Sequence, residues 1–115
     1  MDYKTIVRKS QESYNRFFND IHYLPKEEEI SDITIDIENM QDKIAAKAAQ
    51  AKGHIAYLEQ VKKEIEDQAK ASEESVFTNE RKDTEAKLNK MYDEYVEANK
   101  KLFALQTKIG KLLHK

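Results

Sequence analysis

Leu88–Leu112 reads LNKMYDEYVEANKKLFALQTKIGKL, and it is the most regular stretch of the chain. Hydrophobic residues recur along it at alternating steps of three and four, and nearly all the positions between them are polar or charged. The residues at these steps are Leu88, Met91, Tyr95, Ala98, Leu102, Leu105, Ile109 and Leu112. A period of 3.5 residues predicts a helix whose apolar seam packs lengthwise against another helix. The seam is about 36 Å long at 1.5 Å per residue, so it requires a long partner.

A second periodic stretch precedes it and can supply that partner. We expect a helix that begins near Thr34 to Asp36 and ends near Ala71, with Gln41 and Lys62 as polar interruptions. Its seam comprises Ile37, Ile44, Ala48, Ala51, Ile55, Leu58, Ile65 and Ala69. Small residues are frequent between Ala45 and Ala56. Gly53, which costs a helix about 1 kcal/mol relative to alanine, indicates either a close helix contact or simple tolerance.

The two seams differ in phase, which argues against one straight helix. Turn and cap residues (Ser72, Ser75, Thr78 and Asn79) lie between them, so we predict a helical hairpin with its bend in residues 72–80. Val76 and Phe77 would lie at the tip, either covering the bundle end or exposed. Charge favours the antiparallel arrangement, because residues 26–42 hold seven acids and residues 99–115 hold five lysines and no acid.

The pattern of residues 1–24 predicts a shorter helix rich in aromatic residues, and Pro25 should end it. Its apolar positions are Tyr3, Ile6, Val7, Tyr14, Phe17, Phe18 and Ile21. Tyr14, Phe17 and Phe18 would either plug the end of a bundle or, with Phe77, form an exposed surface for a protein partner. Residues 25–34 form an acidic linker. Isoleucines alternate with polar residues in residues 30–37, which fits a short strand or an extended lead-in to the second helix; we favour the lead-in.

The expected fold is therefore all-α: a long antiparallel helical hairpin of coiled-coil type, residues 35–115, with an additional N-terminal helix. Tyr92, Val96 and Phe103 form a second apolar strip beside the main seam of the last helix. This strip needs its own neighbour, either the N-terminal helix or a second subunit. Because the N-terminal helix has about half the length of the hairpin arms, we predict self-association into a dimer or a larger ring.

Composition narrows the function classes. The chain has 115 residues, 37% of them charged, with a formal net charge of −2 and no cysteine. Disulfides, thiolate metal sites and cysteine nucleophiles are excluded. There is no hydrophobic run of the ~20 residues that would span a bilayer, and the start of the sequence does not resemble a secretory signal. We expect a cytoplasmic protein, which for a viral protein would mean the host cytoplasm or the virion.

The sequence contains no recognisable catalytic, metal-binding or phosphate-binding motif. His22, His54 and His114 are isolated, and Gly53 and Gly110 belong to no phosphate-binding loop. We therefore expect no catalytic residues, cofactor, metal or small-molecule substrate. The basic residues of the last helix (Lys100, Lys101, Lys108, Lys111 and Lys115) could contact single-stranded nucleic acid. Alternatively, these lysines neutralise the acidic linker, and we favour this second interpretation. Binding to an anionic membrane ranks lower, because the leucines of this segment already belong to the seam.

Two short stretches resemble a known family. Ile35-Asp36-Ile37-Glu38-Asn39-Met40 and His54-Ile55-Ala56-Tyr57-Leu58 are similar to motifs of the UvsY-like recombination mediators of tailed phages. The resemblance covers about a quarter of the chain. The spacing between the stretches is longer here, the N-terminal helix is extra, and the family's basic DNA-contacting motif has no clear counterpart. The resemblance implies an oligomeric protein that helps to load a recombinase on single-stranded DNA.

The sequence thus favours a non-catalytic, self-associating protein that serves in interaction or scaffolding. A single-stranded DNA accessory factor of a phage and a small inhibitor of a host protein are the alternatives.

Overall fold

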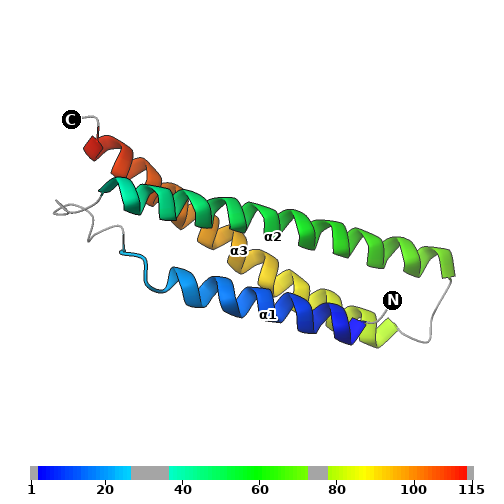
Figure 1. The fold of residues 1–115 in the computed structure, drawn as a ribbon. Helices are drawn as coiled ribbons and strands as arrows, with labels where there is room; N and C mark the ends of the chain where they lie inside the picture. The colour runs from blue at the N-terminus through cyan, green and yellow to red at the C-terminus, as the bar shows by residue number, and fades with distance from the viewer. Residues whose placement is uncertain (1–2, 27–36, 73–77, 114–115) are drawn as a thin grey trace.

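The computed structural model describes residues 3–26, 37–72 and 78–113. These ranges contain three α-helices and no strand, which confirms the all-α prediction: α1 (Tyr3–Ile21), α2 (Ile37–Ser72) and α3 (Thr78–Leu113). The two long helices pack lengthwise in opposite directions as the predicted hairpin, and α1 runs alongside α3 (Figure 1). The molecule is a rod with extents of 60 × 21 × 18 Å.

The seam of α3 forms one wall of the core. Seven of its eight predicted residues are buried, from Leu88 to Ile109, and Leu112 is partly buried against them. Thr84 extends the seam by one more step of four residues towards the hairpin tip and is also buried. The uninterrupted period of 3.5 residues keeps this row of side chains turned towards α2 along nearly the whole helix.

The seam of α2 differs in phase from the prediction over its second half. Ile44, Ala48, Ala51, Leu58 and Ile65 are buried as expected. Val61 is buried in place of Lys62, and Ile55 is only partly buried. From Ala51 onward the inward residues therefore follow a neighbouring row, through His54 and Val61. This row turns towards α1 as well as α3, so α2 meets two helices rather than one.

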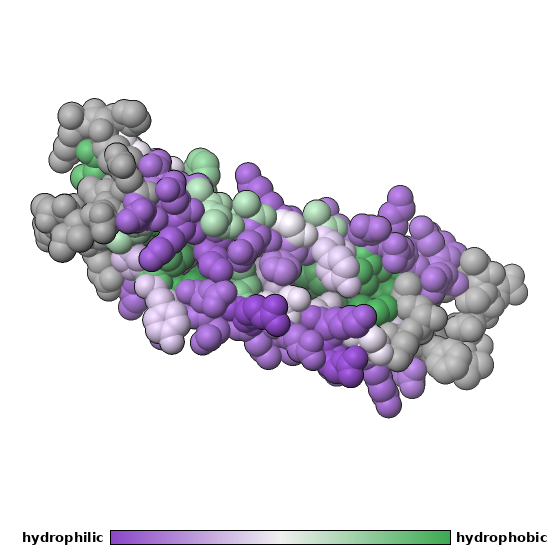
Figure 2. All heavy atoms as spheres, in the orientation of Figure 1, coloured by the Kyte–Doolittle hydropathy of each residue, from purple (hydrophilic) through white to green (hydrophobic). Residues whose placement is uncertain are grey.

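The small residues of α2 mostly face outward. Ala45, Ala46, Ala49 and Ala56 are exposed, and a Cβ atom added at Gly53 would meet nothing within 4 Å. Of the two interpretations left open for Gly53, a close helix contact is not made among the described residues. In the space-filling view, spots of weakly hydrophobic, pale green surface lie among hydrophilic, purple residues along the upper edge (Figure 2).

Helix α1 covers only part of the hairpin. It has 19 residues against 36 in each arm, and it packs mainly on the half of α3 nearest the tip (Figure 1). Phe17 and Ser10 are its buried residues. The helix ends in a turn in which the Leu24 amide donates to the Ile21 carbonyl oxygen at 3.0 Å. Pro25, which has no N–H to donate, follows this turn.

Several predictions fall on residues outside the described ranges. They concern most of the acidic linker, the strand or lead-in of residues 30–36, the exact bend with Val76 and Phe77, and Lys115. Among the described residues, no helix is both long and apolar enough to cross a membrane.

Candidate functional site

An aromatic cluster joins the three helices in the middle of the bundle. Its centre is Tyr95 of α3, which is buried. The ring centroids of Phe17 and Phe18 of α1 lie 5.2 and 5.4 Å from that of Tyr95, and Tyr14 packs on it edge to face at 5.9 Å. These three residues therefore bind α1 to α3 inside the bundle. They neither plug its end nor form an exposed aromatic surface, because α1 runs along the side of the hairpin.

His54 is the member of this cluster that the sequence analysis did not assign. Its ring stacks on Tyr95 with centroids 4.9 Å apart and meets Phe17 at 5.8 Å. Burial lowers the pKa of His54, and burial raises the pKa of Tyr95 to about 12. The sequence did hold a signal for His54, because it lies three residues after Ala51 and four before Leu58, the same steps that mark the seam.

Nothing in this cluster forms a catalytic arrangement. The Tyr95 hydroxyl is buried without a hydrogen-bond partner among the described residues, and the same is true of the Ser10 hydroxyl. Among the described residues, the contacts recorded for the His54 imidazole are with the rings of Tyr95 and Phe17, and no carboxylate bonds it. The described ranges also hold no group of three histidine, aspartate or glutamate residues that could bind a metal. The cluster is best understood as packing between helices.

The second strip of α3 divides between two environments. The Tyr92 hydroxyl donates to Glu59 Oε1 at 2.8 Å, and Lys62 Nζ lies 4.8 Å from the centroid of the Tyr92 ring. The bond to Glu59, more than burial, raises the pKa of Tyr92. Val96 is half-buried, whereas Phe103 is 67% exposed. Tyr92 thus packs on α2 rather than on the N-terminal helix. Of the two neighbours left open for this strip, a second subunit stays a prediction.

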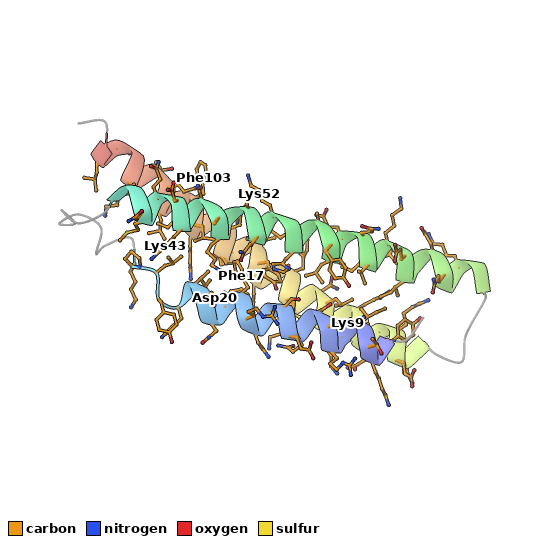
Figure 3. The ribbon with its side chains drawn as sticks, in the orientation of Figure 1. Lys9, Phe17, Asp20, Lys43, Lys52 and Phe103 are labelled. Carbon is orange, nitrogen blue, oxygen red and sulfur yellow. The ribbon has the colours of Figure 1, made fainter. Side chains whose placement is uncertain are left out.

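These residues lie on one side of the hairpin, which we call the outer hairpin face. On α3 it comprises Tyr92, Val96 and Phe103, and on α2 it comprises Ala45, Lys52, Glu59 and Lys62, the last two through their contacts with Tyr92. Phe103 and Lys52 project from the edge of the bundle opposite α1, whereas Asp20 and Lys43 lie on the α1 side (Figure 3). Lys47 Nζ, also on that side, joins α2 to α1 through an ion pair with Asp20 at 3.0 Å.

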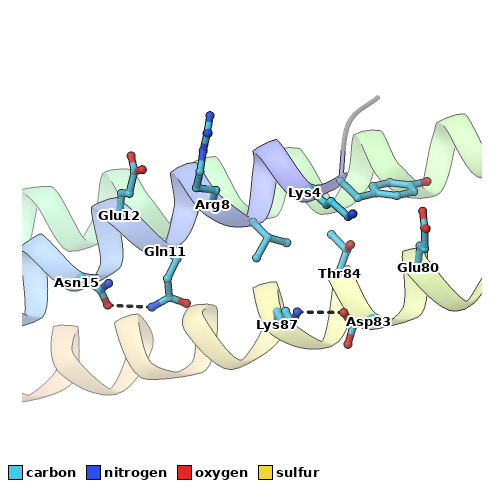
Figure 4. A pocket seen from close by; sticks show the side chains of 11 residues that line it. Lys4, Arg8, Gln11, Glu12, Asn15, Glu80, Asp83, Thr84 and Lys87 are labelled. Atoms are coloured by element: carbon cyan, nitrogen blue, oxygen red, sulfur yellow. Dashed lines mark hydrogen bonds and ion pairs between the residues drawn. The ribbon is translucent and has the colours of Figure 1, made fainter.

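A polar groove lies between the start of α1 and the start of α3 (Figure 4). Tyr3, Val7 and Thr84 are among its lining residues, and charged residues of both signs surround them. Gln11 donates to Asn15 within α1 at 2.9 Å, and Lys87 pairs with Asp83 within α3 at 3.1 Å. These polar contacts are made within each helix, so the groove carries no concentrated charge for a ligand.

A second, larger groove of about 800 Å³ begins where α1 ends. Phe18, Ile21 and Leu24 line it together with Leu102 and Leu105 of α3. Charged residues also line this groove: Lys26 from the segment after α1, and Glu94, Glu97, Lys100 and Lys101 from α3. Two of the predicted nucleic-acid-binding lysines are therefore placed beside carboxylates. Lys111, further along α3, is exposed, and Lys108 is half-buried.

Comparison with known proteins gives no match: no family model fits the sequence, and neither a curated protein nor a solved structure is significantly similar to it. The resemblance to phage recombination mediators therefore stays a prediction from two short stretches.

Proposed function

We propose that this protein is a non-catalytic helical interaction protein that works as a self-associated assembly. The observation that carries the proposal is the exposure of Phe103 on a hairpin only partly covered by α1. A phenylalanine that is 67% exposed leaves most of its ring in water, although burying such a side chain stabilises a protein by about 1.5–3 kcal/mol. A neighbouring subunit would provide that burial.

The distribution of apolar residues supports the same proposal. Helix α2 covers the main seam of α3 and the Tyr92 end of the second strip, but Phe103 at the other end of that strip stays largely exposed. The outer hairpin face keeps Val96 and Phe103 at least partly exposed. Isolated exposed apolar residues are common on protein surfaces, but here they follow one helical strip and adjoin an alanine-rich helix.

The charges favour a protein partner over nucleic acid. Lys100 and Lys101 share their groove with Glu94 and Glu97, so a phosphate backbone would meet both signs of charge. Proteins that bind nucleic acid mainly through phosphates present a continuous basic surface. The alternative role, an accessory factor on single-stranded DNA, is therefore the less supported one.

Light scattering after gel filtration tests the proposal directly. We expect a mass of at least twice the 13.5 kDa of one chain, persisting over a tenfold dilution and in both low and high salt. A monomer under all these conditions would overturn self-association. A labelled single-stranded oligonucleotide, added at low salt, is the second arm. Tight, salt-sensitive binding that is lost in the double variant Lys108→Glu/Lys111→Glu would favour the nucleic-acid role instead.

A further inference from the structure

The register of the hairpin places Phe103 beside the alanines of α2. Tyr92 contacts Glu59 across the hairpin, and the two helices run in opposite directions. Phe103 lies 11 residues after Tyr92, and the residue 11 positions before Glu59 is Ala48. Phe103 also lies eight residues after Tyr95, and the residue eight positions before its stacked partner His54 is Ala46. Phe103 is therefore level with the segment Ala45–Ala49, most of which is exposed.

The outer hairpin face thus combines a protruding ring with a low surface beside it. Phe103 projects from α3, whereas Ala45 of α2, which is exposed, carries only a methyl group at the same level. The ring and this alanine belong to one face, so the face holds both halves of a contact. A surface of this kind can pair with a copy of itself, since a two-fold interface brings each patch against the complementary patch of the other subunit.

The symmetry follows from this arrangement. A two-fold axis parallel to the rod would place α3 of one subunit over α2 of the other, in antiparallel orientation and at the same level. This is the relation that α2 and α3 already have within the hairpin. Phe103 of each chain would then cover Ala45 of its partner, and the product would be a bundle with four long helices in its centre and an α1 on each outer side.

Charge and size also fit a second copy. The outer hairpin face includes Lys52, Glu59 and Lys62, of both signs, so neither a strongly acidic nor a strongly basic partner is preferred. The long side of the whole rod measures 60 × 21 Å, an outline large enough to contain the about 800 Å² that each partner buries in a typical stable interface.

We propose that the outer hairpin face is a homodimer interface in which Phe103 of one chain packs on the exposed Ala45 of the other. The inference rests on the self-association proposed above and specifies where it occurs. It assigns α1 to the outside of the dimer, so that both grooves lined by α1 remain accessible after assembly.

A pair of complementary variants tests this contact. Phe103→Lys and Ala45→Glu each place a charge where the dimer would be apolar, and we expect each variant alone to be monomeric. Mixed in equal amounts, they should form a heterodimer. In this heterodimer one of the two contacts keeps Phe103 on Ala45, and the other pairs the introduced lysine with the introduced glutamate. Rescue on mixing depends on these two positions being neighbours across the interface.

Tyr57→Ser is the matched control, because Tyr57 is also an exposed aromatic residue of the hairpin (46% exposed) but does not belong to the outer hairpin face. It should keep the wild-type mass. Circular dichroism establishes that each variant is folded, and Phe103→Ser replaces Phe103→Lys if the lysine lowers the helix content. The interface is wrong if the wild type is oligomeric and Phe103→Lys stays so, or if mixing does not restore the dimer. A monomeric wild type would instead reject self-association itself.

Discussion

The imidazole of His54 lies flat on the phenol ring of Tyr95, with the two planes inclined by only 18°. The pair joins α2 to α3 at the level where α1 adds Phe17, whose ring meets both residues. A titratable ring thus lies at the junction of all three helices. Among the described residues, Phe17 and Tyr95 are the recorded side-chain partners of His54, and none of these residues supplies a counter-ion for a charged imidazole.

Acidification should therefore weaken the fold through His54. Its pKa in the folded protein is lowered by burial, so the unfolded chain binds the proton more readily. The contribution of His54 to the free energy of unfolding is fully present above the pKa of the unfolded chain, about 6.5. It declines as the pH falls through that value towards the lower pKa of the folded protein. Urea unfolding at pH 8, 7, 6 and 5.5 measures the decline. His54→Gln should flatten it, with His22→Gln as the exposed control, and an unchanged slope in His54→Gln would contradict the assignment.

Removing the Tyr95 hydroxyl should not lower the free energy of unfolding. The group is buried and has no hydrogen-bond partner among the described residues, and such a group costs about 1–3 kcal/mol. Tyr95→Phe should leave the free energy of unfolding unchanged or raise it by up to about 2 kcal/mol, whereas Tyr95→Ala should lower it by about 3–5 kcal/mol. Thermal and urea unfolding followed by circular dichroism compare the two. A clear loss in Tyr95→Phe would show that the hydroxyl does have a partner, such as a bound water.

Gly53→Ala should stabilise α2. A Cβ atom at this position meets nothing within 4 Å, and alanine favours a helix interior by about 0.8–1 kcal/mol over glycine. The gain should appear as a higher midpoint of thermal unfolding with an unchanged oligomeric mass, since Gly53 lies outside the proposed interface. Gly110→Ala, at the second open glycine, is a comparison near the end of α3, where helix fraying should reduce the gain. Destabilisation by Gly53→Ala would reveal a close neighbour at this position in the assembly.

The ion pair between Lys47 and Asp20 should contribute little. Its 3.0 Å distance is short, but the side chains are 21% and 45% exposed, and pairs of this kind contribute about 0–1 kcal/mol. A double-mutant cycle with Lys47→Ala and Asp20→Ala measures the coupling between α1 and α2, and it should shrink in high salt. A coupling above about 1 kcal/mol would mean that this contact, and not only the aromatic cluster, determines how α1 docks.

The sequence predicted α3 in detail because one uninterrupted period governs it. For α2 two neighbouring rows of residues fit the helix about equally well, one through Ile55 and Lys62 and the other through His54 and Val61. The choice depends on where α1 lies, which is a contact distant in sequence. The apolar face of α1, with its aromatic residues, was also recognised from its regular spacing. The position of α1 along the hairpin was not, since nothing local in a short amphipathic helix specifies which turn of its neighbour it meets.

For the candidate site, the sequence identified Phe103 as part of a second strip but could not assign its neighbour. Tyr92 and Phe103 share a helical face, and only the structure shows that Tyr92 bonds Glu59 while Phe103 is left exposed. The difference arises because α2 presents a long polar side chain at one level and alanines at the other.

The parallel course of α1 and α3 has a mechanical consequence. The described chain begins with α1 near the hairpin tip and finishes with α3 at the opposite end of the rod (Figure 1). Tension applied between Tyr3 and Leu113 would slide α1 along α3, so the ring contacts around Tyr95 would resist together. Once α1 had slipped, the same tension would reach the hairpin at its open end and separate α2 from α3 one turn after another. Along its length the rod is therefore expected to yield in two stages, with the short helix as the element that bears load first.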